Sequence, residues 1–335
     1  MEDTDWTDIL KNINEKECTP FIGEGASASW LYLGRDLASK WADQHGYPLP
    51  LEDLEESYRL TSVAQFMAIK KRDPNEPKNL LSEYIKEKDK DKPDFSLDEY
   101  KTTPYAVLAD LNLPIYITTN YDLLMESALE KKGKKPISEF CRWNNDLKAL
   151  AKLPDFAPVF DRKYRYRPTS DQPLVYHLLG LYLLRGRYRL TDKDQDVVEN
   201  KMLPSSMVLT EKDYIDFVIF LNKEDEKTIF PPVIREALAR HSLLFIGYKL
   251  EDISFRVIFQ GVVSFQASYR KKGLAVQLPP SIAKSKQEQA VGKQEQAEEY
   301  LEQYTKDMYK VSVYLGDSAK FSEELHQRWD NFKKR

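Results

Sequence analysis

The chain has 335 residues, of which 41% are hydrophobic and 31% charged, with a formal net charge of −4. This composition supplies the core of a large α/β domain, and the slightly acidic balance argues against a dedicated nucleic-acid-binding protein. No apolar run approaches membrane-spanning length, the acidic start lacks the pattern of a secretory signal, and two cysteines cannot form a four-thiolate zinc site, so we expect a soluble cytoplasmic protein without zinc.

The first predicted strand is Cys18–Ile22, which follows a short helix over 5–17. It leads into a loop of small residues, Gly23–Ser29, and then into a helix over 30–45. Strand, glycine loop and helix in this order can present backbone N–H groups to a phosphate. Only Gly23 and Gly25 match the dinucleotide-binding fingerprint, and tight turns often contain the same Gly-x-Gly pattern.

The stretch between the first and second predicted strands is long and helical. Helices are predicted over 54–71, 79–88 and 97–111, with a charged loop over 86–94. Because residues 46–112 exceed what a simple crossover needs, we expect them to form a helical insert over the sheet.

The second predicted strand lies in Pro114–Asp122 and ends in polar residues. An amphipathic helix begins directly after it, at Leu123. In open parallel sheets ligands bind beyond the carboxyl ends of the strands, which places Thr119, Asn120 and Asp122 where such a domain would do its chemistry. The alternative is that Asn120 and Asp122 only cap the helix.

Strands and helices continue to alternate along the rest of the chain. Strands are predicted over 173–180, 207–210, 242–248, 274–278 and 311–314. Helices are predicted from residue 210, over 232–240, from residue 251 and over 321–332. The alternation predicts one doubly wound, Rossmann-like α/β domain over 1–335, with a parallel sheet and the helical insert.

Three other features have a plain structural interpretation. His177 interrupts an apolar strand, and a lone histidine there is more often a hydrogen-bonded core residue than a catalyst. Residues 162–167 interleave basic and aromatic side chains, which could grip single-stranded nucleic acid, but a solvated loop or protein contact is favoured. Residues 281–298 are rich in Lys, Gln and Glu and indicate an exposed polar loop that merges into a helix.

Five segments, in this order, resemble motifs of the SIR2-like family, in the branch found in bacterial antiviral defence. They correspond to its glycine loop, its Thr-x-Asn-x-Asp motif, the site of its catalytic histidine and two further blocks: Phe21–Ser27, Thr118–Asp122, Tyr176–Gly180, Leu209–Tyr214 and Phe245–Asp252. The ordered set is more specific than any one motif. The deacylase sirtuins carry four zinc-ribbon cysteines, and this chain does not.

The resemblance implies an NAD+ hydrolase that releases nicotinamide, in which Asn120 orients the ribose and the attacking water and His177 is the base. Other residues are implied to contact NAD+: Gly23, Gly25, Ala26 and Ser27 at the diphosphate, Thr119 at the elbow after the second strand, and Gly247, Tyr248 and Asp317 toward the adenosine. Asp122 would hold the nicotinamide amide or fix the elbow. Three positions depart from the family pattern. Glu24 replaces a small residue, Lys249 replaces Ser or Thr, and two leucines separate His177 from Gly180.

The resemblance also implies a role in anti-phage defence by NAD depletion, and such an activity must be gated. Control would come from assembly into a homo-oligomer, with the helical insert as the candidate interface, or from a partner such as a HerA-type ATPase or an Argonaute-like protein. Two alternatives remain open. One is a non-catalytic nucleotide-binding scaffold for a partner protein, and the other is a protein deacylase, which the absence of zinc-ribbon cysteines disfavours.

Overall fold

The computed structural model describes residues 3–31, 33–150, 158–160, 166–183, 203–223, 230–263, 271–279 and 287–334. Residues 162–165 of the basic stretch and 281–286 of the polar stretch lie outside them. The strands are β1 (Cys18–Ile22), β2 (Ile115–Thr118), β3 (Ile137–Phe140), β4 (Leu174–His177), β5 (Ser242–Ile246), β6 (Gly273–Gln277) and β7 (Val311–Leu315). Among the described helices, none is long and apolar enough to cross a membrane.

The strands form one seven-stranded sheet in the order β3-β4-β2-β1-β5-β6-β7, and every pair is parallel. This confirms the predicted doubly wound α/β fold. After β1 the chain builds β2, β3 and β4 on one side, then crosses back to place β5, β6 and β7 on the other. The order therefore reverses at β1, and in such sheets ligands bind at the carboxyl ends beside the reversal.

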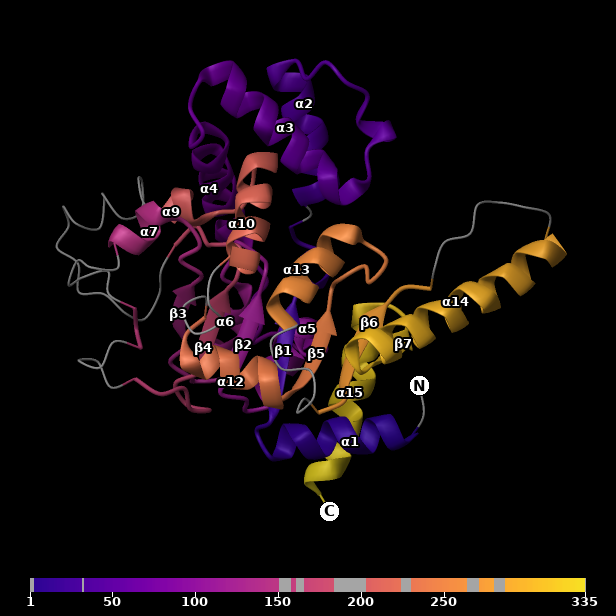
Figure 1. The fold of residues 1–335 in the computed structure, drawn as a ribbon. Coiled ribbons are helices and arrows are strands. Elements are labelled where there is room, and N and C mark those ends of the chain that lie inside the picture. Colours follow the sequence, from indigo (N-terminus) through magenta and orange to yellow (C-terminus); the bar gives the residue numbers. More distant parts are fainter. Residues whose placement is uncertain are drawn as a thin grey trace.

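Helices cover both faces of the sheet (Figure 1). The longer ones are α1 (Asp3–Asn14), α2 (Ala38–His45), α3 (Glu56–Lys71), α4 (Glu76–Lys88), α5 (Pro104–Asp110), α6 (Leu124–Lys131), α7 (Asn145–Leu150), α10 (Glu211–Lys223), α12 (Pro232–Arg240), α13 (Ile253–Val263), α14 (Gln287–Tyr309) and α15 (Ser318–Lys333), with a single turn at α9 (Leu203–Ser206). Side chains alternate along each strand, so that Phe21 packs in one hydrophobic layer and Ile22 in the other.

Two predictions about strands need correction. Met207–Thr210 is not a strand, because the N–H groups of Leu209 and Thr210 donate to the Asp213 carboxylate and cannot pair with a neighbouring strand. In contrast, β3 is a strand that the sequence pattern does not predict, since two of its four residues are polar. Its Ser138 and Glu139 are fully buried: Ser138 donates to Glu126 on α6, and Glu139 pairs with Arg142 and accepts the Val159 N–H, contacts that hydrophobic periodicity does not reveal.

The residues between β1 and β2 divide into two groups. Helices α2, α3 and α4 lie together at the top of Figure 1, at the opposite end of the molecule from α1. Helix α5 instead packs beside α6 and α15 in one of the layers that cover the sheet. The part of the predicted insert that stands apart from the sheet layers is therefore α3 and α4, together with α2 before them.

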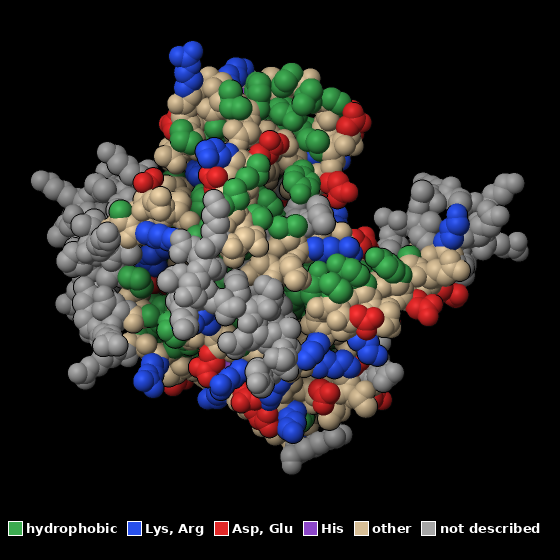
Figure 2. Space-filling model, in the orientation of Figure 1, with side chains coloured by type: hydrophobic (Ala, Val, Ile, Leu, Met, Phe, Trp, Pro, Cys, Tyr) green, Lys and Arg blue, Asp and Glu red, His purple; other side chains and the backbone are tan. Residues whose placement is uncertain are grey.

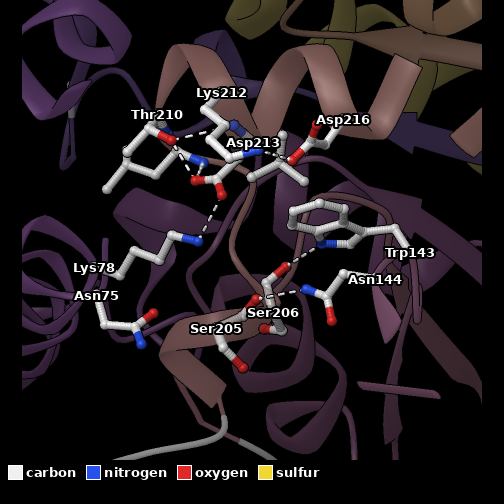
Figure 3. A network of polar contacts seen from close by, with 12 residues as sticks. Asn75, Lys78, Trp143, Asn144, Ser205, Ser206, Thr210, Lys212, Asp213 and Asp216 are labelled. Carbon is white, nitrogen blue, oxygen red and sulfur yellow. Dashed lines mark hydrogen bonds and ion pairs between the residues drawn. The ribbon is translucent and has the colours of Figure 1, made fainter. Parts of the chain in front are cut away.

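Buried polar contacts attach this helical group to the start of α10 (Figure 3). The ammonium of Lys78, on α4, lies 2.8 Å from a carboxylate oxygen of Asp213, and both side chains are largely buried. The other Asp213 oxygen accepts the Thr210 N–H at 2.9 Å, while the Thr210 hydroxyl accepts the Asp213 N–H at 3.1 Å. From α3, Ser62 donates to Glu211 at 2.6 Å. This reciprocal capping box and its lysine fix the position of the group relative to the sheet.

Two features of the surface stand out. Helix α14 extends away from the body of the protein, and its C-terminal part packs against β7 (Figure 1). Hydrophobic side chains are visible over the α2–α4 group and over α10 and α13 (Figure 2). The large hydrophobic residues that remain exposed there include Ile69, Ile215, Ile219 and Val257.

We expect Lys78→Met to lower the free energy of unfolding by about 3–5 kcal/mol, because it leaves the buried Asp213 carboxylate without its cation. Lys212 provides a matched control, since it pairs at 2.7 Å with Asp216 but both side chains are exposed. Lys212→Met should change the free energy of unfolding by less than about 1 kcal/mol. Urea denaturation measures both, and equal effects of the two substitutions would contradict this account of the contact.

Candidate functional site

Most of the predicted site residues lie together at the carboxyl ends of three adjacent strands. Gly23 directly follows β1, Asn120 follows β2 and Gly247 follows β5. Because β1 lies between β2 and β5, the three loops meet where the strand order reverses. The fold thus brings segments separated by more than 200 residues into one site.

One main-chain oxygen joins the three strands at this point. The Ile22 carbonyl, at the end of β1, accepts hydrogen bonds from the Thr119 N–H at 3.0 Å, the Thr118 hydroxyl at 3.1 Å and the Tyr248 hydroxyl at 2.8 Å. Because the Tyr248 proton is used in that bond, the 2.9 Å contact between the Thr119 and Tyr248 hydroxyls has Thr119 as its donor. Thr119 and Tyr248 therefore brace the ends of β2 and β5 against β1.

The glycine loop packs directly on the turn after β5. The Gly23 N–H donates to the Ile246 carbonyl at 2.9 Å, and the Gly25 N–H donates to the Gly247 carbonyl at 3.0 Å. Gly247 has a φ of +83°, and a Cβ atom there would lie 2.3 Å from the Ala26 nitrogen. Any other residue at position 247 would therefore force the two loops apart.

The N–H groups at the start of the glycine loop are already used within the protein. Those of Gly23, Gly25, Ala26 and Ser27 all donate to main-chain carbonyl oxygens. The next two N–H groups, of Ala28 and Ser29, belong to exposed residues and make no hydrogen bond to any residue that the structure describes. Within this segment, the donors available to an anionic ligand therefore lie one to two residues beyond the predicted diphosphate loop.

Asn120 is held by its side-chain nitrogen. Its Nδ2 donates to the Gly23 carbonyl at 3.2 Å and to the Tyr105 hydroxyl at 3.0 Å, with the Ser27 hydroxyl at 3.5 Å. Because a carbonyl can only accept, the nitrogen and not the oxygen of the carboxamide must face Gly23. Oδ1 is left with no hydrogen bond to the described residues, so it is the acceptor that the site can offer to a ligand.

His177 is fully buried and both of its ring nitrogens are engaged. Nδ1 lies 3.0 Å from the main-chain carbonyl of Asn120, and Nε2 lies 2.8 Å from a carboxylate oxygen of Glu126 on α6. The same Glu126 oxygen accepts a hydrogen bond from Ser138 at 2.6 Å. His177 thus connects β4 and α6 with the main chain of the Asn120 elbow.

This geometry restricts where His177 can exchange a proton. Nδ1 faces a carbonyl and must keep its hydrogen, whereas Nε2 faces Glu126, so a proton can move only within the His177–Glu126 pair. Burial lowers the pKa of His177, but the charge and hydrogen bond of Glu126, together with the Asn120 carbonyl, outweigh burial and raise it above the ordinary value. In this arrangement His177 orients the Asn120 main chain and makes no contact suited to proton abstraction from a ligand.

Asp122 hydrogen-bonds the start of α6 and also places a buried carboxylate in the same elbow as Asn120. Its Oδ1 accepts the Leu124 N–H at 2.9 Å, which forms an Asx turn just before α6, whose N-cap residue is Leu123. The side chain is almost completely buried, and burial raises the pKa of Asp122 to about 6 despite that hydrogen bond and the nearby His177. At neutral pH Asp122 is therefore an ionised buried carboxylate beside Asn120.

Asp317 lies apart from the other predicted residues. It is the N-cap of α15, where its carboxylate accepts the Lys320 N–H at 2.7 Å. It follows β7, which is three strands away from β1, or about 14 Å at the usual strand spacing. Its expected contact with the adenosine stays a prediction.

Two residues that the sequence analysis did not single out belong to the site. Tyr105 holds the Asn120 carboxamide, and Glu126 holds His177. The sequence does mark Glu126 as unusual, because it is the only charged residue in the otherwise uncharged stretch Leu123–Leu129. In the described part of the chain, no group of three or more His, Cys, Asp or Glu side chains could hold a metal ion.

Comparison with known families gives a match. A family model described as the SIR2-like domain matches residues 114–308, which is more than half of the chain. The matched region begins at β2 and includes Asn120, His177 and Gly247, whereas the glycine loop after β1 precedes it. No curated protein matches the chain significantly.

We expect the free energy of unfolding to fall as the pH rises above about 6.5, the ordinary pKa of histidine. The folded-state pKa of His177 is raised, so its contribution to stability is complete below the unfolded value and is lost as the pH rises through the folded value. Urea denaturation between pH 6 and pH 9 measures this slope. Glu126→Gln should flatten it, because the substitution removes the carboxylate that raises the pKa.

Two control variants test the assignment of this slope. Asp122→Asn should change the pH dependence of the free energy of unfolding only in a lower pH range. The pKa of Asp122 is raised to about 6 in the folded protein, so its contribution to stability is lost as the pH rises from the ordinary carboxyl value to 6. His326→Gln, at a partly exposed histidine on α15, should leave the slope unchanged. A slope that survives in Glu126→Gln and disappears in His326→Gln would refute the role of the buried pair.

Proposed function

The chain belongs to the SIR2-like domain family, and from that membership and the geometry at Asn120 we propose that it hydrolyses NAD+ and releases nicotinamide. The observation that carries the proposal is the Asn120 carboxamide. Its nitrogen is fixed by the glycine loop, and its oxygen has no partner among the described residues. An oxygen held in this way can accept a hydrogen bond from a ribose hydroxyl or from the attacking water.

In the proposed reaction the water oxygen forms a bond to C1′ of the nicotinamide ribose, and the bond from C1′ to the nicotinamide nitrogen breaks. The electron pair of the broken bond goes to the ring nitrogen, so nicotinamide leaves as a neutral molecule and needs no acid. The water loses one proton to solvent. Positive charge develops on the ribose, and the buried Asp122 carboxylate, ionised at neutral pH, would stabilise it.

The remaining predicted residues would bind the nucleotide from the three loops. We assign the diphosphate to the outer side of Gly23–Ser27, with the exposed N–H groups of Ala28 and Ser29 as its donors. Thr119 and Tyr248 would support the site by fixing the strand ends, as their contacts with the Ile22 carbonyl suggest. The role we propose for His177 is to position Asn120 through the main chain, with Glu126 behind it.

The engaged ring nitrogens of His177 also favour a second candidate function. A domain with the same loops but without a base could bind a nucleotide and serve as a scaffold for a partner protein, with no turnover. The two functions share the binding site and differ only in whether nicotinamide is released. A protein deacylase is the third possibility, and turnover that required an acylated peptide would identify it.

As for its biological role, we propose an effector of anti-phage defence that depletes NAD+ and is gated by self-assembly or by a partner such as a HerA-type ATPase or an Argonaute-like protein. The resemblance to the defence branch motivates this role. Exposed apolar side chains in the predicted insert, Leu49, Ile69 and Leu97, are compatible with an interface.

We expect the active protein to be an oligomer, because assembly would bury between copies the apolar side chains that are exposed in the single chain. Light scattering at micromolar concentrations should give a mass above 39.1 kDa, the mass of one chain. Ile69→Asp should lower both the measured mass and NAD+ turnover. A monomer with full turnover would exclude gating by assembly.

We expect the pure protein, in its assembled state, to release nicotinamide from NAD+, and Asn120→Ala to lower kcat about a hundred- to thousandfold through loss of one positioned polar group. The matched control is Asn144→Ala, which removes an asparagine that bonds the Ser205 carbonyl away from the site. Chromatography of free nicotinamide measures turnover, and thermal denaturation checks the fold. Turnover retained by a folded Asn120→Ala protein would reject the assignment.

The same assay separates the roles of His177. If His177 positions Asn120, His177→Gln and Glu126→Gln should lower kcat by similar amounts, since each breaks the same chain of contacts. If His177 is the base, His177→Gln should lower kcat about a hundred- to ten-thousandfold, whereas Glu126→Gln should lower kcat much less. NAD+ binding by calorimetry with no nicotinamide release in any condition would favour the scaffold.

A further inference from the structure

We infer that Tyr105 is a positioning residue that sets the orientation of the Asn120 carboxamide, so that its oxygen and not its nitrogen is presented to the ligand. The consequence for catalysis rests on the proposed NAD+ hydrolysis. The orientation itself is a property of the folded chain and can be measured without turnover.

The two hydrogens of the Asn120 amide each have one good acceptor. The Gly23 carbonyl lies 3.2 Å from Nδ2 and the Tyr105 hydroxyl lies 3.0 Å from it, whereas the Ser27 hydroxyl is more distant at 3.5 Å. The amide nitrogen is therefore saturated only while Tyr105 is present. Without that hydroxyl one buried N–H would keep only the long contact to Ser27, which favours rotation of the carboxamide.

The Tyr105 hydroxyl keeps its proton, because burial together with the charge of Asp122 raises the pKa of Tyr105. The Ser27 hydroxyl lies 3.5 Å from the same Asn120 nitrogen. Ser27 in turn donates to the Glu24 carbonyl at 3.0 Å. Ser27, Tyr105 and Asn120 are all buried, and they join the glycine loop, α5 and the end of β2 in one network.

Packing determines where this hydroxyl lies. Tyr105 is the second residue of α5 and is 4% exposed, with its ring centroid 6.1 Å from that of Phe95. The first residue of the helix is Pro104, whose fixed φ suits the start of a helix. The aromatic ring is thus held by the core, and the hydroxyl reaches Asn120 from a different element than the one that carries Asn120.

The test is Tyr105→Phe in the full chain, because it removes one oxygen and keeps the ring. The matched control is Tyr116→Phe, at a buried tyrosine on β2 whose hydroxyl bonds the Leu108 carbonyl at 3.1 Å. We expect Tyr105→Phe to lower kcat about tenfold to a hundredfold with little change in KM, as displacement of a reacting group does. Tyr116→Phe should leave kcat and KM unchanged.

A second measurement reports on the orientation directly. The side-chain amide signal of Asn120 in nitrogen-correlated NMR, assigned by its absence in Asn120→Asp, should shift in Tyr105→Phe and stay in place in Tyr116→Phe. If the wild-type protein releases no nicotinamide, the proposed function fails, and the amide signal alone decides the inference. An amide signal unmoved by Tyr105→Phe, or a kcat equal to that of Tyr116→Phe, would overturn it.

Discussion

The main-chain oxygen of Ile22 is the point on which the geometry of the site depends. Three donors from β2 and from the turn after β5 converge on it, so the central strand and its two neighbours end at one place. A carbonyl has two lone pairs, and this one is fully used by the protein. The strand ends therefore cannot shift independently, and the main chain of Asn120 is fixed in position even without the contacts of its side chain.

A buried ionic frame adds to this main-chain junction. His177 and Glu126 hold the elbow from below, and Lys78 with Asp213 ties the helical group to α10 above the strand ends. A buried ion pair costs desolvation free energy that a hydrophobic pair would not cost. Removing one partner destabilises the protein strongly, because the other charge is left buried and unpaired. Such pairs favour one arrangement over its competitors, which is what a site built from several loops requires.

The sequence predicts the part of this arrangement that follows from periodicity and chain order. Alternating strands and helices lead to the parallel sheet, and the polar residues after β2 lead to Asn120 and Asp122. Periodicity does not identify contacts between distant elements, so the contacts of Glu126 with His177 and of Tyr105 with Asn120 are found only in the structure. The same limit applies to β3, because hydrophobic periodicity does not predict that Ser138 is buried against Glu126 or that Glu139 is buried beside Arg142 and Val159.

The close approach of Gly247 to Ala26 bears on how such a domain can change over evolution. The contacts between the glycine loop and the turn after β5 are main-chain contacts that tolerate no side chain at position 247, whereas the chemistry that we propose resides in side chains such as Asn120 and Asp122. Substitutions that end an activity would therefore leave these contacts intact. A lineage built on this design can exchange catalysis for binding in a few steps, without passing through an unfolded intermediate.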